Sequence, residues 1–346
     1  MANLVVSSVC NLECAHCFAR PSLQPRASRN RQAFVSLEAF ERYLDYLDRS
    51  RISEARLLGG EPSLHPAFSE LIRRARQRNK HIVVFTHGLL SEQALASLES
   101  LTPEEGTILV NMNAGAASET LVQDFQEHRR KTLLRLGPRV IPGFTIVKPE
   151  FHAGFILPLI LETGCQKVIR LGLAQPALAG RNAYLHPKQY VLTGRNIVRL
   201  AEAAGKAGII LDFDCGFVPC MFSEVDMQLL RQSEVRVAWR CSPVIDLGLD
   251  GIVQHCFPLS ERIWLPLDSS DNAASLQNAL QEQTRAFRVA GIYKECSSCI
   301  LKLDNECPGG CLAATFGRFS RTAFRLRLPA ELTPAQDSTP NYQTIH

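Results

Sequence analysis

Short apolar runs alternate with amphipathic stretches along the first part of the chain. Residues 3–9, with the apolar run Leu4, Val5 and Val6, are expected to form a short buried strand. After Ser36, which can cap a helix, Leu37, Phe40, Leu44 and Leu47 recur at helical spacing. The alternation predicts further strands at 55–58, 82–86, 107–111, 143–147, 167–173 and 209–213, and further helices at 68–78, 91–100 and 187–204.

Strands separated by helices run parallel, because each crossover returns the chain to the same edge of the sheet. The pattern therefore predicts an α/β protein, with a partial (β/α)6 barrel of the TIM type over residues 1–214. From 215 to 322 the sequence is broken by proline, glycine and cysteine, which predicts a small irregular C-terminal lobe. Residues 323–346, rich in Pro, Thr and Gln, are expected to form a flexible tail.

Composition supports a folded protein and narrows its partners. The 346 residues are 46% hydrophobic and 21% charged, close to ordinary globular usage. The net charge of +4 is too small and too dispersed to favour a nucleic-acid partner. The N-terminus lacks the features of a signal peptide, and the chain has no apolar run long enough to span a membrane. These features predict a cytoplasmic protein without a membrane or nucleic-acid partner.

Twelve cysteines stand mostly in short spacings, which is typical of metal ligation in a reducing compartment. Three of them, Cys10, Cys14 and Cys17, lie on the loop after the first predicted strand. Three thiolates can bind three irons of a four-iron cube and leave the fourth iron open for a small molecule. A zinc site is the alternative, but three ligands on one tight loop without a nearby fourth fit structural zinc poorly.

This loop resembles the signature of the radical S-adenosylmethionine (SAM) superfamily, which has the same spacing and an aromatic residue, here Phe18, after the third cysteine. The resemblance implies a [4Fe–4S] cluster whose open iron binds SAM. It also implies that reductive cleavage of SAM gives a 5′-deoxyadenosyl radical that abstracts a substrate hydrogen. The electron would come from a reducing partner such as flavodoxin or ferredoxin.

Gly59, Gly60, Glu61 and Pro62 follow the second predicted strand and resemble the superfamily motif that binds the methionine amino group of SAM. Glycines without Cβ let backbone carbonyls approach a ligand closely, and a carboxylate beside an ammonium group would stabilise it. A plain connection between strand and helix is the alternative for such a turn.

Three further residues are candidate cofactor contacts. Asn111 and Asn113, at the end of the fourth predicted strand, could hydrogen-bond the ribose hydroxyls, and a structural role in the loop is the alternative. Arg170, on the sixth strand, could pair with the SAM carboxylate or form a structural ion pair. His87 stands where relatives often have asparagine in a Thr-Asn-Gly turn, and could be structural.

The C-terminal cysteines resemble a SPASM domain, which binds auxiliary iron–sulfur clusters. Nine residues separate Cys241 from Gly251 and four separate that glycine from Cys256. The sequence departs from that pattern in two respects, because seven residues instead of five separate Cys299 from Cys307 and no cysteine follows Cys311. Eight thiolates, the number that two four-cysteine clusters need, are nevertheless present: Cys215, Cys220, Cys241, Cys256, Cys296, Cys299, Cys307 and Cys311.

By analogy with the SPASM family, one cluster would take Cys220 with Cys241, Cys256 and Cys311. The other would take Cys296, Cys299 and Cys307, with Cys215 as the candidate fourth ligand. A zinc ribbon formed by Cys296, Cys299, Cys307 and Cys311 is the alternative. Cys165, a lone cysteine among apolar residues, is expected to be a buried hydrophobic side chain.

Relatives with such a lobe mostly modify ribosomally made peptides or proteins, by crosslinking, epimerisation or oxidation. The resemblance therefore implies a peptide-modifying enzyme. A radical reaction on a small-molecule substrate is one alternative. The other is a non-catalytic electron carrier, which would have no need of a cofactor-shaped barrel.

Overall fold

A single ten-stranded sheet forms the centre of the protein, in a computed structural model that describes residues 2–23, 32–113, 119–260 and 262–319. The strand order is β10-β9-β8-β1-β2-β3-β4-β5-β6-β7. The strands are β1 (Asn3–Ser7), β2 (Glu54–Gly59), β3 (His81–Thr86), β4 (Gly106–Asn111), β5 (Val140–Ile146), β6 (Val168–Leu173), β7 (Ile210–Phe213), β8 (Asp246–Leu247), β9 (Ile252–Gln254) and β10 (Trp264–Pro266).

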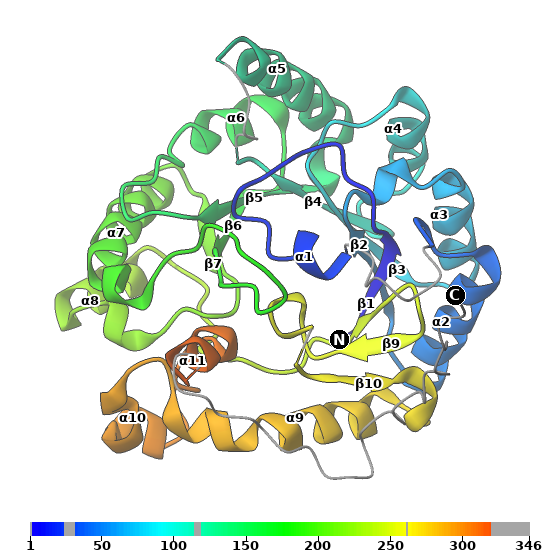
Figure 1. Cartoon of the computed structure of the whole chain (residues 1–346). Coiled ribbons are helices and arrows are strands. Elements are labelled where there is room, and N and C mark those ends of the chain that lie inside the picture. The colour runs from blue at the N-terminus through cyan, green and yellow to red at the C-terminus, as the bar shows by residue number, and fades with distance from the viewer. Residues whose placement is uncertain (1, 24–31, 114–118, 261, 320–346) are drawn as a thin grey trace, which may run out of the picture.

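Helices α2 to α7 cover the outer face of this sheet (Figure 1). The helices of the described chain are α1 (Arg20–Leu23), α2 (Leu37–Arg49), α3 (Phe68–Gln77), α4 (Glu92–Glu99), α5 (Glu119–Leu136), α6 (Ile156–Thr163), α7 (Tyr190–Lys206), α8 (Glu224–Gln232), α9 (Ala273–Ala290), α10 (Ile300–Leu303) and α11 (Leu312–Phe319). Strands β1 to β7 are all parallel to their neighbours. The predicted α/β class is therefore confirmed, with seven parallel strands in the barrel part instead of about six.

Helix α2 shows how the sequence pattern produces these elements. The Ser36 side chain accepts a hydrogen bond from the Ala39 amide and so caps the first turn. Phe40, Leu44 and Leu47, at helical spacing, are fully buried against the sheet. The strands need no such periodicity, because β1 is buried along its whole length.

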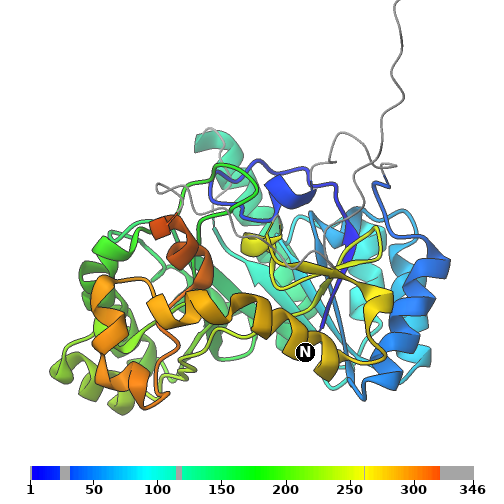
Figure 2. The same cartoon turned by 60° about the horizontal axis from the view of Figure 1, so that its bottom comes forward.

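The carboxyl ends of the parallel strands meet at one mouth of the curved sheet. The loop with the first three cysteines follows β1, and the Gly-Gly-Glu-Pro turn follows β2. This loop and helix α1 lie over the mouth (Figures 1 and 2). Barrel enzymes place their chemistry at this end of the sheet, because loops from several strands converge there.

The C-terminal lobe is more regular than its sequence predicts. Strand β8 pairs in parallel with β1, and β8, β9 and β10 continue the sheet as an antiparallel meander. The Asn3 amide donates a hydrogen bond of 2.6 Å to the buried carboxyl of Asp246 at this junction. Helix α9 runs along the open side of the barrel, from α10 and α11 to β10 (Figures 1 and 2).

Because the sheet continues across residue 214, the division into a barrel (1–214) and a lobe (215–322) stays a proposal about the chain's organisation. The proposed tail, 323–346, lies outside the described residues.

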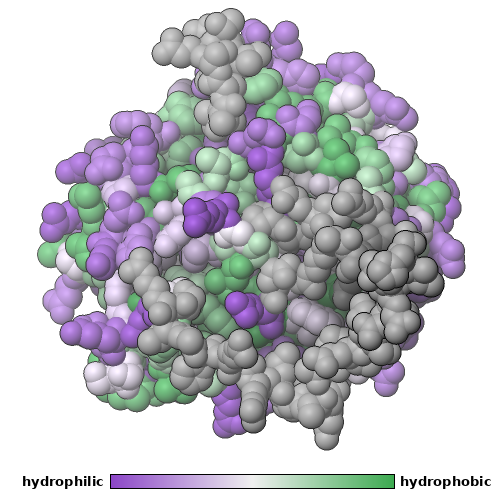
Figure 3. Space-filling view, viewed as in Figure 1, coloured by the Kyte–Doolittle hydropathy of each residue, from purple (hydrophilic) through white to green (hydrophobic). Residues whose placement is uncertain are grey.

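Charged and polar side chains gather around the rim of the face seen in Figure 3. On α2 and α3, Arg78 forms ion pairs with Glu41, Asp45 and Asp48 at 2.8 to 3.1 Å. Such exposed pairs contribute little to stability, since water screens them. None of the helices in the described part of the chain has the length and apolar composition that crossing a lipid bilayer would require.

Candidate functional site

The loop after β1 brings Cys10, Cys14 and Cys17 together at the mouth of the barrel. The Cys17 amide donates to the Cys14 carbonyl at 3.1 Å, which folds the loop into a turn. Two backbone amides face the sulfurs, because Leu12 N–H donates to Cys10 Sγ at 3.5 Å and Arg20 N–H to Cys17 Sγ at 3.3 Å. Amides in this position stabilise thiolates, the form that ligates metal.

The three thiols lie close enough to influence one another's ionisation. Burial raises the pKa of Cys10, and the charges of Glu61, Cys14 and Cys17 raise it further. Burial also raises the pKa of Cys14, with a further contribution from Cys17. A cationic metal centre would remove this repulsion, so the loop fits such a centre.

The two glycines of the Gly-Gly-Glu-Pro turn pack directly on the backbone that leads into the cysteine loop. A Cβ on Gly59, whose φ is +146°, would lie 2.0 Å from the Ser7 carbonyl oxygen, and one on Gly60 would lie 2.2 Å from that of Val9. The Gly60 amide donates to the Ser7 carbonyl at 2.7 Å. The structure thus adds a second reason for both glycines, the close approach of the backbone of residues 7–9, and their predicted contact with a ligand stays a prediction.

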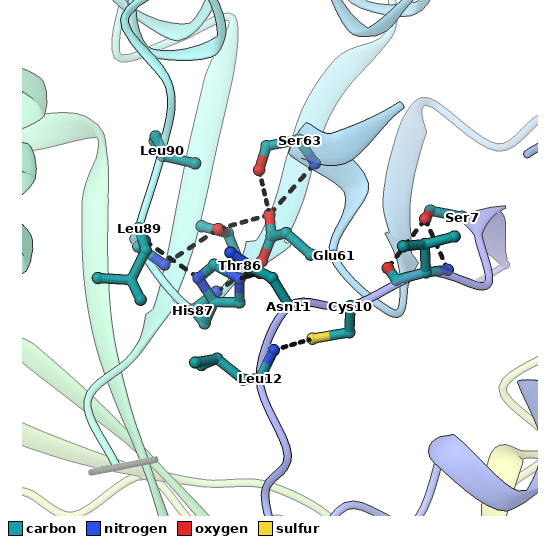
Figure 4. Close-up of polar contacts among 12 residues, drawn as sticks. Ser7, Cys10, Asn11, Leu12, Glu61, Ser63, Thr86, His87, Leu89 and Leu90 are labelled. Carbon is teal, nitrogen blue, oxygen red and sulfur yellow. Dashed lines mark hydrogen bonds and ion pairs between the residues drawn. The ribbon is translucent and has the colours of Figure 1, made fainter. Parts of the chain in front are cut away.

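Glu61 is buried and uses both carboxylate oxygens inside the protein (Figure 4). Oε1 accepts hydrogen bonds from the Ser63 amide and hydroxyl and from the Thr86 hydroxyl, and Oε2 accepts one from the His87 amide. These bonds join the turn after β2 to the end of β3. The predicted contact of Glu61 with the cofactor stays a prediction, and these bonds give the residue a structural role as well.

His87 connects this carboxylate to the cysteine loop. Its Nδ1 accepts a hydrogen bond from the Leu89 amide at 3.1 Å, so the proton of the neutral ring lies on Nε2. Nε2 is 2.7 Å from the Asn11 side-chain oxygen and 3.2 Å from Glu61 Oε2. Burial lowers the pKa of His87 despite the Glu61 charge, which favours this neutral form. Asn11, next to Cys10, is therefore held by the turn that follows β3 (Figure 4).

Asn111 and Asn113 lie at the same mouth, after β4. The Asn113 side chain donates to the Thr145 carbonyl at 2.8 Å and accepts from the Thr145 amide at 2.7 Å. The Asn111 side-chain oxygen accepts from the Asn113 amide at 2.9 Å. Asn113 therefore continues the pairing of β4 with β5, and the predicted ribose contacts of both residues stay predictions.

Arg170 projects from β6 on the inner side of the sheet. Its guanidinium pairs with Asp214 at 2.8 Å and lies over the Phe85 ring, 5.3 Å from its centroid. This is the structural ion pair that the sequence left open as an alternative. The carboxylate of Asp214 comes directly after β7 and precedes Cys215, so the pair links the barrel to the first cysteine of the lobe.

A cavity of about 460 Å³ opens beside the cysteine loop, between the ends of β4 and β5 and helix α5. Phe144 and Phe151, whose rings are 6.0 Å apart, form part of its wall. Its ionisable lining consists of His16, Arg129, Lys148 and His152, with no carboxylate among the described residues. The cavity is therefore suited to a ligand that carries a negative group.

Arg129 is the functional candidate that the sequence did not reveal. It lies on α5 with only 2% of its surface exposed, its Nε donates to the His87 carbonyl at 2.7 Å, and it lines the cavity. Among the described residues it forms no ion pair with a carboxylate, and its charge acts on the Cys14 thiol. A buried cation without a counter-ion is costly, which marks Arg129 as an anion-binding residue. The irregular periodicity of α5 gave no signal for it.

Cysteines of the lobe lie close enough to influence one another's charge, and their role as cluster ligands stays a prediction. Several buried polar atoms beside them have no hydrogen-bond partner in the described part of the chain, namely both side-chain atoms of Gln175 and the Tyr190 hydroxyl. The position of a Cβ on Gly216, next to Cys215, is 2.5 Å from Gln175 Nε2 and 3.8 Å from the Cys311 Cβ. Unpaired donors of this kind fit a bound group that offers acceptors, such as the sulfurs of a cluster.

Within the described residues, no three His, Cys, Asp or Glu side chains are arranged to bind a single metal ion. A zinc ion would need its sulfur ligands at about 2.3 Å from one centre. A four-iron cube is larger and holds its thiolates farther apart. The assignment of the thiols to clusters instead of zinc therefore stays a prediction from the sequence pattern.

Comparison with known proteins identifies the barrel. Residues 4–135 match the profile of the Radical SAM superfamily. Over 117 residues, 34% of this chain, the sequence is 27% identical to the antilisterial bacteriocin subtilosin biosynthesis protein AlbA of Bacillus subtilis (strain 168). This match spans about a quarter (24%) of the length of AlbA.

Solved structures share the fold over most of the chain. Native anSMEcpe with bound AdoMet aligns with a TM-score of 0.60 and 17% identity, over 90% of this chain and 89% of that one. Streptococcus suis SuiB bound to S-adenosylmethionine aligns with a TM-score of 0.63 and 16% identity, over 90% of this chain and 73% of that one. Both alignments reach well into the C-terminal lobe, and they confirm the predicted partial barrel. The profile match and the cysteine loop show a Radical SAM domain over residues 4–135, and the solved structures show the fold that this domain and the rest of the chain share with them.

Proposed function

We propose that this chain is a radical SAM enzyme that modifies a peptide. The observation that carries the proposal is the place of the three-cysteine loop, at the barrel mouth beside a cavity that contains a buried, unpaired arginine. Three thiolates leave one iron of a four-iron cluster without a protein ligand. The cavity and Arg129 supply room and charge for a small molecule next to that iron.

Cys10, Cys14 and Cys17 would hold the cluster, and Arg129 would receive the carboxylate of SAM. When bound, the cluster would supply an electron and SAM would supply the sulfonium group that this electron cleaves. The cleavage would give methionine and a 5′-deoxyadenosyl radical, which would take a hydrogen from the substrate. The hydrogen bonds of His87 to Glu61 and Asn11 hold the cysteine loop against the ends of β2 and β3. The phenylalanine walls of the cavity exclude water from a reactive intermediate.

The relatives suggest the class of substrate. AlbA takes part in the biosynthesis of a bacteriocin, anSMEcpe has been solved with the Cp18Cys peptide, and SuiB with the precursor peptide SuiA. We extend this to a peptide substrate for the present chain, held between the barrel mouth and the lobe. Two auxiliary clusters in the lobe would accept or relay an electron, and flavodoxin or ferredoxin would reduce the protein.

The release of 5′-deoxyadenosine tests the reaction. Anaerobically reconstituted protein, reduced with dithionite, should release 5′-deoxyadenosine and methionine from SAM, and Cys14→Ala should reduce the release to background. Cys165→Ala is the matched control, because Cys165 is buried against Thr163, away from both cysteine groups, and should leave the rate unchanged. An inactive wild type that holds its full complement of iron would contradict the proposal.

The substrate class needs a separate experiment. A candidate precursor peptide, incubated with enzyme, SAM and reductant, should change in mass only when Cys14 is intact. Stoichiometric coupling of 5′-deoxyadenosine to a small molecule, with every peptide left unchanged, would exclude the peptide assignment and leave the radical reaction in place.

A further inference from the structure

The eight cysteines of the lobe divide into two groups of four, and the division differs from the one that the sequence suggested. The Cys215 thiol lies within electrostatic range of Cys241 and Cys311. The Cys220 thiol lies within electrostatic range of Cys307, Cys296 and Cys299. The two neighbouring cysteines thus face different partners.

The first group is assembled by the β8–β9 hairpin and helix α11. Cys241 and Cys256 flank the hairpin, which the Val244 amide closes by donating to the His255 carbonyl at 2.9 Å. Cys311 stands at the start of α11, and the Leu312 amide at this helix end faces the Cys241 sulfur. Cys311, Cys241 and Cys215 are in turn the thiols that act on Cys256.

Cys215 approaches this group directly from the end of β7. The Cβ position of the following residue, Gly216, is 3.8 Å from the Cβ of Cys311. Gln175, whose side chain has no hydrogen-bond partner among the described residues, lies at the same point. The backbone therefore places Cys215 beside Cys311, independently of any charge effect.

The second group is built on the turn around helix α10. The Cys307 amide donates to the Leu301 carbonyl at 2.9 Å, which folds the chain after α10 back onto that helix. The Ile292 amide donates to the Gly309 carbonyl at 2.9 Å. A Cβ on Gly291 would lie 2.7 Å from Cys296 Sγ, so this thiol is packed tightly against the same turn. Cys296, Cys299 and Cys307 thus offer three thiols on one compact element.

Cys220 reaches this turn from a short 3-10 helix, Pro219–Met221, that packs on α7. The contact is close at Gly194, where a Cβ would lie 2.1 Å from the Met221 carbonyl oxygen. Just before α7, the Pro187 carbonyl accepts a hydrogen bond of 2.6 Å from the Tyr293 hydroxyl. The Tyr293 phenol interacts electrostatically with both Cys220 and Cys296, so both thiols lie near its hydroxyl group.

We propose that Cys220 is the fourth ligand of the cluster held by Cys296, Cys299 and Cys307, and that Cys215 completes the cluster held by Cys241, Cys256 and Cys311. An upstream cysteine thereby takes the place of the ligand that the SPASM pattern has after its last CxxxC cysteine, and the two cysteines exchange places relative to the sequence-based assignment. The proposal rests on the proposed function in so far as the lobe binds two clusters.

Protection of the thiols from alkylation tests the assignment in the full-length, anaerobically reconstituted protein. In the double variant Cys296→Ala/Cys299→Ala, iodoacetamide should label Cys220 and leave Cys215 protected, as read by peptide mass spectrometry. In the matched variant Cys241→Ala/Cys256→Ala, Cys215 should be labelled and Cys220 protected. The reverse pattern would overturn the proposal.

Serine substitutions decide the matter if either double variant loses both clusters, because serine keeps an oxygen ligand and perturbs the lobe less. Cys220→Ser should alter the same electron paramagnetic resonance signal as Cys299→Ser, and Cys215→Ser the same signal as Cys256→Ser. If Cys220→Ser altered the Cys256→Ser signal instead, the assignment would be wrong.

The outcome is separable from the test of the proposed function. Labelling of all eight lobe thiols in reconstituted wild-type protein would overturn the cluster assignment, even if 5′-deoxyadenosine were still released. Conversely, protected thiols in a protein that cleaves no SAM would preserve the assignment and contradict the proposed reaction.

Discussion

The two cysteine-rich regions of the molecule differ in how completely they surround a metal centre. The loop after β1 offers three thiols at the barrel mouth, next to a cavity and a buried arginine. In the proposed assignment the lobe offers two groups of four thiols, and Cys307 and Cys311 are buried in it. A three-thiol site leaves a coordination position for a reactant, whereas a four-thiol site is closed and suited to electron transfer. Ligand number, more than ligand type, separates the reactive end of the protein from the supporting one.

The largest effect that would separate the loop from the lobe is expected at Arg129, on the affinity for SAM. Arg129→Leu should weaken SAM binding about 100-fold, because it removes a buried charge opposite the carboxylate. Isothermal titration with SAM measures the change, and Arg129→Lys should recover part of the affinity. Arg130→Gln is the matched control, since the neighbouring Arg130 pairs with Glu162 at the surface and should change the affinity less than about twofold. Equal losses in Arg129→Leu and Arg130→Gln would remove Arg129 from the site.

The stability of the β1–β8 junction, where the barrel meets the lobe, should depend on pH through Asp246. Burial raises the pKa of Asp246 to about 7, against 3.8 in the unfolded chain, so the folded state binds the proton more tightly. Its contribution to stability is present at low pH and is lost as the pH rises from about 4 through 7. Asp246→Asn should therefore raise the free energy of unfolding by about 2 kcal/mol at pH 8 and have little effect at pH 4.

Urea unfolding at the two pH values measures this difference. Asp268→Asn, at an exposed position near β10, is the control and should show no such dependence. A stabilisation by Asp246→Asn that is the same at both pH values would show that the buried carboxyl does not titrate in this range.

A smaller effect is expected where the cysteine loop meets β3. His87→Ala removes the hydrogen bonds to Asn11 and Leu89 and should reduce the rate of 5′-deoxyadenosine release about tenfold, at roughly 0.7 kcal/mol for each of the two lost bonds. It should also change the resonance spectrum of the loop's cluster, which a general loss of stability would not do. His87→Gln should restore part of the rate, since its amide can still donate to Asn11.

His128→Ala, in the neighbouring helix α5, is the matched control for this substitution. The His128 ring forms a hydrogen bond of 3.1 Å between its Nε2 and the Leu90 carbonyl oxygen. In the described structure it has no hydrogen bond to the cysteine loop or to Glu61. A His87→Ala spectrum identical to wild type would refute a positioning role for the ring.

The smallest effect is expected in the lobe, where a substitution at Gln175 should change the reduction potential of one cluster. Gln175→Leu removes a donor beside Cys215 and Cys311, which should lower the reduction potential of that cluster by on the order of 50 mV. Donors to cluster sulfurs stabilise the more negative, reduced state, which sets the direction. Redox titration followed by paramagnetic resonance should show this shift in one cluster and none in the loop's cluster. If the reduction potential of the loop's cluster shifted instead, Gln175 would not act on the lobe cluster and the prediction would be wrong.

Much of the barrel followed from periodicity because its elements are regular. The buried run of β1 and the amphipathic face of α2 each carry a local signal, and the structure confirms both. Strand β5 was expected to begin at 143 but begins at Val140, since Pro142 weakens the signal of a strand. The lobe's strands β8 to β10 are two or three residues long, too short for a periodic pattern. They exist because they pair with a strand that lies far away in sequence.

Some residues of the candidate site could likewise be predicted from the sequence, and others could not. The spacing of Cys10, Cys14 and Cys17 is a local property of the sequence, and the fold brings these residues to the barrel mouth as expected. Arg129 has no such spacing, because its position depends on how α5 packs across the ends of β3 and β4. The partners of Cys215 and Cys220 likewise depend on the direction in which the chain leaves β7, which no count of intervening residues reveals.

The pairing of β1 with β8 has a consequence for the order in which the protein can fold. Asn3 and Asp246 are 243 residues apart, so β1 cannot complete its hydrogen bonding until the chain has been synthesised as far as β8. Until then one edge of β1 stays open to pairing with other chains. Synthesis that stops before Asp246 would leave that edge exposed, and such fragments are expected to aggregate.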